Sequence, residues 1–176
     1  YDKLENEQHL FSAATVSFTG EDYRRAIELF SLFVKKYPNS NDINKAQLHL
    51  ADSYYNNKDY DTATQRYLEL IRPGIDSDIL LNSLNGLEWS ASQGKKSDFV
   101  KLLNQIDSKG LPEDFKITLL KRKADYFYTK GMWNDVVNAI NELTKTSISK
   151  SELRDYRKLL GIAMTNLRRY IEAEEI

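Results

Sequence analysis

Apolar residues recur at three- and four-residue spacing along most of the chain, which is the period of an α-helix with one buried face. No segment shows the sustained alternation of apolar and polar residues that is typical of a β-strand. The pattern therefore predicts an all-α protein of roughly ten helices, each about 10–17 residues long and joined by short turns. The spacing is clearest in three stretches: Leu29, Leu32 and Phe33; Leu68 and Ile71; and Val136, Ile140 and Leu143.

Glycine and proline fall where these helices are expected to end, and capping residues fall where they are expected to begin. Asp59 precedes one predicted helix, and Ser149 with Glu152 has the spacing of a capping box. The acidic pairs Asp59/Asp61 and Asp76/Asp78 lie in such turns, where helix starts favour acids. We therefore interpret them as caps and not as a calcium loop. The helix-ending residues are Tyr37-Pro38, Arg72-Pro73-Gly74, Gly94, Gly110-Leu111-Pro112 and Gly131.

A helical hairpin repeats along the chain, marked by a small residue in its first helix. Two antiparallel helices approach closely only where a side chain is small, so Ala51 and Ala63 are expected to be buried at the crossing of one hairpin. The small residue occurs at Ala14, Ala51, Gly86, Ala124 and Gly161, at spacings of 37, 35, 38 and 37 residues. Nine residues further on stand Tyr23, Tyr60, Lys95, Trp133 and Tyr170, and Ala26, Ala63 and Ala173 follow three of them.

Two of the five copies depart from the pattern. In the third copy, residues 93–96 resemble a lengthened turn, and Asp98 or Phe99 stands where alanine is usual, so we expect wider or differently angled packing there. The fifth copy stops early, because residues 170–176 begin a second helix that lacks its last turns. Solenoid ends normally need a polar cap, so either fraying of this truncated end or association through it is expected. Together with the start at Tyr1, this indicates a fragment of a longer chain.

The pattern resembles the tetratricopeptide repeat family over nearly the whole chain. The resemblance implies a right-handed α-α superhelix of about five helical hairpins, the last one truncated, forming a single repeat domain over residues 1–176. An irregular helical bundle is the alternative. The best copy matches the family with Leu50, Ala51, Tyr54, Tyr60, Ala63 and Tyr67. The implied repeats cover approximately residues 5–38, 41–74, 76–110, 112–147 and 149–176.

Residues 22–71 are also similar to the repeats of bacterial cell-envelope proteins. Examples are the lipoprotein of the outer-membrane barrel assembly machinery and the periplasmic coordinator of the Tol–Pal system. The segment from Phe30 to Ser40 and the segment from Ala51 to Tyr55 carry this likeness. It implies a periplasmic or outer-membrane-associated protein in a bacterium. Cytoplasmic repeat arrays use similar sequences, so that location remains an alternative.

Composition and motifs narrow the classes of function. A net charge of −1 argues against nucleic-acid binding, which needs a basic surface. The chain has no cysteine, and no apolar run approaches the length of a membrane span. Its two histidines, His9 and His49, lack metal-site spacing, and neither a phosphate loop nor a serine elbow is present. We therefore expect no enzyme activity, no metal and no cofactor.

The resemblance also implies where a partner would bind. In the family, the first helix of each hairpin lines a concave groove, so exposed aromatic residues beside acids would form a cradle for a protein or peptide. Tyr55 beside Asp52 and Tyr128 beside Asp125 would be two similar docking points one repeat apart. The alternative is that these residues pack between neighbouring first helices. The implied groove residues are Phe18, Asp52, Tyr55, Asn56, Leu87, Asp125, Tyr128 and Thr129, with Ile162 at the matching position of the fifth copy.

One familiar binding mode of the family does not fit. A clamp for a carboxyl-terminal peptide needs basic side chains at positions that here are Phe11, Thr15, His49, Leu80 and Leu84. The sequence instead favours a protein- or peptide-binding scaffold in a bacterial envelope assembly. The alternative is a regulatory or substrate-recruiting module attached to an enzyme domain.

Overall fold

The structure, a computed structural model, describes residues 2–95 and 98–168. Within these residues the chain forms nine α-helices and no strand, so the all-α prediction is confirmed. The chain divides into two compact units, Tyr1–Asp107 and Ser108–Ile176. A tenth helix was expected over residues 170–176, which lie outside the described residues together with Tyr170 and Ala173 of the fifth copy.

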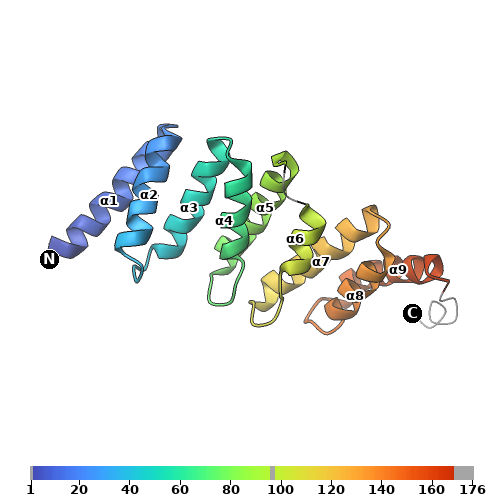
Figure 1. The fold of residues 1–176 in the computed structure, drawn as a ribbon. Coiled ribbons are helices and arrows are strands. Elements are labelled where there is room, and N and C mark those ends of the chain that lie inside the picture. Colours follow the sequence, from blue (N-terminus) through green and yellow to red (C-terminus); the bar gives the residue numbers. More distant parts are fainter. Residues whose placement is uncertain (1, 96–97, 169–176) are drawn as a thin grey trace. The chain divides into compact units, whose positions relative to one another are not determined.

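The first unit consists of three successive helical hairpins. Each helix packs against the next one along the chain, and α3 also packs against α1 and α5. The first helices of consecutive hairpins therefore lie side by side, as expected for stacked repeats (Figure 1). The helices are α1 (Asp2–Thr19), α2 (Tyr23–Lys36), α3 (Ile43–Asn56), α4 (Tyr60–Leu70), α5 (Ser77–Gln93) and α6 (Phe99–Gln105).

The second unit contains one hairpin and the first helix of another. Its helices are α7 (Glu113–Thr129), α8 (Trp133–Leu143) and α9 (Lys150–Asn166). α8 packs against both α7 and α9, and α7 also contacts α9 directly. This unit thus repeats the arrangement of α3, α4 and α5 in the first unit.

The small residues of the repeat behave as predicted in the first, second and fourth copies. Ala51 and Ala63 are fully buried, which confirms their place at the crossing of α3 and α4. Gly86 is needed for another close approach, because a Cβ atom there would lie 2.3 Å from Cζ of Tyr67 on α4. Gly161 differs, since a Cβ atom there would meet nothing within 4 Å among the described residues.

The turns inside four of the repeats share one backbone geometry. Seven residues after the small residue, the chain adopts positive φ at Glu21 (62°), Lys58 (65°), Gly131 (67°) and Arg168 (60°). In the α3–α4 turn, Asp59 N–H then donates to the carbonyl oxygen of Tyr54 at 2.9 Å. A left-handed residue followed by this bond is the usual way to end one helix and release the chain for the next.

The third hairpin departs from this geometry. Gly94 has an extended backbone with φ −70°, and α6 has only seven residues and packs lightly on α5. The light packing of α6 on α5 agrees with the wider or differently angled packing expected for this copy. Asp98 starts α6 by accepting the Val100 N–H at 3.0 Å, so it is an N-cap and does not fill the alanine position of the repeat. Lys96 lies outside the described residues.

Candidate functional site

A cleft built from first helices lies between α7 and α9 in the second unit. Its volume is about 580 Å³, and both helices contribute charged and apolar side chains to its walls. On α9, Asp155, Leu159 and Ile162 stand four and then three residues apart, so helical geometry places them on one face. The lining residues are Lys121, Asp125, Glu152, Asp155, Tyr156, Lys158, Leu159 and Ile162.

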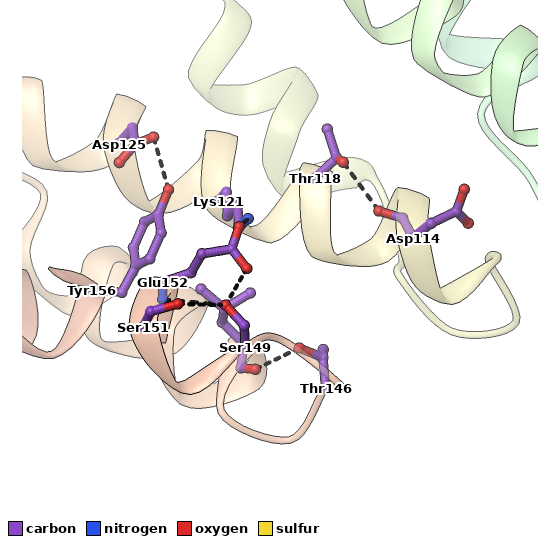
Figure 2. Close-up of polar contacts among 10 residues, drawn as sticks. Asp114, Thr118, Lys121, Asp125, Thr146, Ser149, Ser151, Glu152 and Tyr156 are labelled. Atoms are coloured by element: carbon purple, nitrogen blue, oxygen red, sulfur yellow. Dashed lines mark hydrogen bonds and ion pairs between the residues drawn. The ribbon is translucent and has the colours of Figure 1, made fainter. Parts of the chain in front are cut away.

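A capping box at the start of α9 positions one wall of the cleft. Ser149 is the N-cap, and its Oγ accepts the backbone N–H of Glu152 at 3.3 Å. The same hydroxyl donates to Glu152 Oε2 at 2.6 Å (Figure 2). The predicted Ser149–Glu152 cap is therefore confirmed, and it fixes the Glu152 carboxylate at the helix start.

An ion pair joins the two helices at this end of the cleft. Lys121 Nζ on α7 lies 2.5 Å from Glu152 Oε1 on α9. Bonding to Lys121, and then to Ser149, lowers the pKa of Glu152 from its ordinary value. The Lys121 side chain is only 26% exposed, so this contact ties α7 to α9 while leaving the carboxylate in solvent.

A second contact between α7 and α9 holds an acid inside the cleft. Tyr156 Oη donates to Asp125 Oδ2 at 3.1 Å, as Figure 2 shows. Burial raises the pKa of Asp125, although the bond from Tyr156 and the nearby Lys121 charge oppose that shift. Burial, followed by the adjacent Asp125 charge, raises the pKa of Tyr156. Tyr156 on α9 therefore donates to Asp125 as an uncharged phenol, and it does not neutralise the carboxylate.

The apolar part of the cleft follows these acids along α9. Ile162 is 42% exposed, and Leu159 lies one turn before it. Large apolar side chains that remain open beside charged ones are typical of binding surfaces. Ile162 is the residue that the repeat pattern placed on the groove, and its exposure agrees with that expectation.

The other predicted groove residues of the second unit lie near the turn between α7 and α8. Tyr128 is half-buried, and its ring packs edge-to-face on Trp133 with centroids 5.7 Å apart. Thr129 is exposed, and its hydroxyl donates to the Tyr126 carbonyl oxygen at 2.7 Å. Asp125 is therefore the predicted groove residue that the structure brings into the cleft.

The aromatic groove residues of the first unit make the same kind of contact as Tyr128. The Tyr55 ring packs on Tyr60 at 5.4 Å, and the Phe18 ring packs on Tyr23 at 5.8 Å, both edge-to-face. In each pair the first ring is four residues after the small residue and the second is nine residues after it. Each pair joins the end of a first helix to the start of the second helix of the same hairpin, which differs from the packing between neighbouring first helices given as the alternative.

Asp52 and Asn56 are held by their own hairpin. Tyr67 Oη on α4 donates to Asp52 Oδ1 at 2.6 Å, and burial raises the pKa of that phenol. Asn56 is exposed, and its amide donates to the Asp52 carbonyl oxygen at 2.8 Å. Asp52 thus has a tyrosine partner like that of Asp125, although the two tyrosines come from different positions in the repeat.

Leu87 does not lie on an open groove surface, contrary to the sequence-based expectation. It is fully buried, whereas Trp89, at the repeat position of the packed aromatics Tyr54 and Phe127, is 58% exposed. α4 contacts the Gly86 and Ser90 side of α5, since Thr64 Oγ1 donates to Ser90 Oγ at 2.9 Å. Ser90 therefore lies on the side of α5 that faces α4.

Sequence reasoning missed Tyr156 and Leu159 as cleft residues. Neither stands at a groove position of the repeat, so the repeat gave no signal for them. The spacing of Asp155, Leu159 and Ile162 is the signal that was available, because it marks a mixed charged and apolar helical face.

Neither a metal site nor a membrane-spanning helix is found in the described ranges. They contain no group of three or more metal-ligating side chains placed to hold an ion. No helix among them combines the length and apolar character needed to cross a membrane.

Comparisons with known proteins give a family match and likenesses to solved structures. Residues 4–76 match the model of the YfiO family, which is described as outer membrane lipoprotein. The matched segment runs from α1 to α4. No curated protein matches the chain.

Two of the similar solved structures are tetratricopeptide-like repeats of a candidate kinesin light chain from Podosopora anserina. The chain is similar to the crystal structure of these nearly identical repeats with 16% identity and a TM-score of 0.45, over 96% of this chain and 92% of the other. A variant of the same repeats with one substitution gives 17% identity and a TM-score of 0.45, over 96% and 91% of the two chains.

Proposed function

We propose that this chain is a protein- or peptide-binding scaffold of a bacterial envelope assembly, and that its partner contacts the cleft between α7 and α9. The observation that carries the proposal is the cleft itself. In it, solvent-accessible apolar side chains lie near Asp125, between two first helices that a hydrogen bond joins. A partner would bury Ile162 and Leu159 and would meet charges already held in place.

The place in the envelope has separate support. The family match over residues 4–76 carries the description outer membrane lipoprotein. The segment that resembles envelope repeats, residues 22–71, lies inside that match. The first unit supplies the likeness, while the proposed binding cleft lies in the second unit.

Site-specific photocrosslinking in the source cells tests both parts of the proposal. A photoreactive residue at Ile162 is expected to capture an envelope protein, which mass spectrometry would identify. The matched control is the same residue at Asn141, which is exposed on α8 in the same unit but away from the cleft. Equal capture at both positions, or none at Ile162 in a folded chain, would contradict a partner in this cleft.

A further inference from the structure

We infer that the α7–α9 cleft selects peptide segments that carry a basic side chain followed, two or three residues away, by a bulky aliphatic one. The inference rests on the proposed function and adds the chemistry of the partner. It follows from how the charges in the cleft are paired and where its apolar surface begins.

The charges of the cleft do not cancel. Its walls carry three carboxylates, from Asp125, Glu152 and Asp155, and two ammonium groups, from Lys121 and Lys158, which leaves one negative charge. Lys121 pairs with Glu152 at 2.5 Å, and Lys158 pairs with Asp155 at 3.0 Å. The unbalanced charge therefore lies at Asp125, whose partner Tyr156 is neutral.

The two ion pairs differ in how easily a partner could replace them. The Lys158 and Asp155 side chains are 69% and 75% exposed, and pairs of this kind contribute little because water and salt screen them. Lys121 is mostly covered and links two helices, so it is costly to displace. An incoming guanidinium or ammonium group can therefore take the place of Lys158 at Asp155 and contact Asp125 as well.

The apolar surface sets the second requirement. Leu159 and Ile162 follow Asp155 along the same face of α9. Seven residues of helix separate Asp155 from Ile162, a rise of about 10 Å. An extended peptide covers that distance in about three residues. A peptide whose basic group contacts the acids thus places the side chain two or three residues away over Ile162.

An acidic segment fits this cleft poorly. It would add negative charge beside Asp125, and the ammonium group most easily reached, that of Lys158, is exposed, so water and salt would screen a pair with it. The better covered ammonium group of Lys121 is already bonded to Glu152 and holds α7 to α9. An entirely apolar segment would leave the Asp125 carboxylate without a new partner while removing water from it. Both classes are outcomes of the test below.

Selection of a phage-displayed library of random twelve-residue peptides on the full chain tests the inference. We expect enrichment of peptides in which Arg or Lys stands two or three residues from Leu, Ile, Met or Val. Enriched peptides, synthesised with a fluorophore, would then be titrated by fluorescence anisotropy. Asp125→Asn and Ile162→Ser should each weaken binding about tenfold, which corresponds to about 1.4 kcal/mol.

Two further variants make the charge requirement specific. Asp78→Asn removes an exposed carboxylate from the start of α5, outside the cleft, and should leave the affinity unchanged. Asp125→Lys should reverse the selection, so that peptides with an acid beside the aliphatic residue are enriched. Thermal melts of every variant would separate loss of binding from loss of folding.

The failure of this inference can be told apart from the failure of the proposed function. If acidic or purely apolar peptides are enriched and Ile162→Ser still abolishes their binding, the cleft binds peptides but the inferred chemistry is wrong. If no peptide is enriched, or binding responds to neither cleft variant, both the inference and the peptide-binding cleft are overturned.

Discussion

The phenol of Tyr67 donates a hydrogen bond of 2.6 Å to Asp52 Oδ1, joining the two helices of one hairpin. Asp125, which the repeat pattern aligns with Asp52, accepts its hydrogen bond from Tyr156 of the following hairpin. The two acids are therefore equivalent in sequence but not in surroundings. Asp52 is bonded within its own α3–α4 hairpin, while Asp125 spans two hairpins and lines a cleft.

Removing the Tyr67 hydroxyl should destabilise the first unit. Tyr67→Phe is expected to lower the free energy of unfolding by about 1–3 kcal/mol, because the half-buried Asp52 carboxylate loses a charge-assisted bond. Urea denaturation measures the effect. A double-mutant cycle with Asp52→Ala should return a coupling energy of similar size, whereas a coupling near zero would show that the contact contributes nothing to stability.

Gly86 should not tolerate a side chain. Gly86→Ala is expected to cost about 1–3 kcal/mol, because the added Cβ would overlap the Tyr67 ring and the ring also holds Asp52. Gly161→Ala is the matched control, since it adds the same atom at the same repeat position where the described residues leave space. Alanine there should be neutral or stabilise α9 by up to about 1 kcal/mol. Equal losses of unfolding free energy in the two variants would show that Gly86 is not needed for the contact with Tyr67.

The left-handed turn residues offer a gain in stability. Lys58 has φ 65°, which strains a residue with a Cβ atom, so Lys58→Gly should raise the free energy of unfolding by about 1 kcal/mol. Gly131→Ala should lower it by about 1–2 kcal/mol, since Gly131 has φ 67°. The control is Gln93→Gly, at the same repeat position but within α5, where glycine should be destabilising. Chemical denaturation of the three variants would give the comparison.

The Lys121–Glu152 pair should make stability depend on pH. The folded-state pKa of Glu152 lies below its ordinary value of 4.5, so the pair stabilises the protein above that pH and the stabilisation is lost as pH falls through the folded-state pKa. Glu152→Gln should therefore be less stable than the natural chain at pH 7, and the difference should shrink below about pH 4. A difference that stays constant from pH 7 to pH 3 would contradict the pair.

The edge-to-face pairs predict a structural role for Tyr55 and Tyr128 in their hairpin turns. If the rings brace the turns, Tyr55→Ala and Tyr128→Ala should each cost about 0.5–1.5 kcal/mol beyond the loss of buried area. Thermal unfolding and partner binding should be measured together. Variants that keep full stability but lose the partner would favour direct contact in the groove over packing against Tyr60 and Trp133.

Much of the fold could be predicted from the sequence because its signals are local. The three- and four-residue apolar spacing defines the helices, and a cap such as Asp59 or Ser149 defines where they begin. Ala51 and Ala63 could be placed at a helix crossing because only a small side chain permits that approach. The departure of the third copy could also be predicted, because its turn and the residue at its alanine position differ in sequence from those of the other copies.

The proposed binding surface depends on tertiary contacts that the repeat pattern does not predict. Leu87 and Asp125 stand at the same groove position of two repeats. Leu87 is nevertheless buried in α5, which packs against α4 through its Gly86 and Ser90 side. Asp125 instead lines the cleft between α7 and α9. The repeat thus determined which residues belong to first helices. Which side of each helix is covered, and which neighbour bonds its acids, depends on side chains fifteen or more residues away. Only folding brings these side chains together.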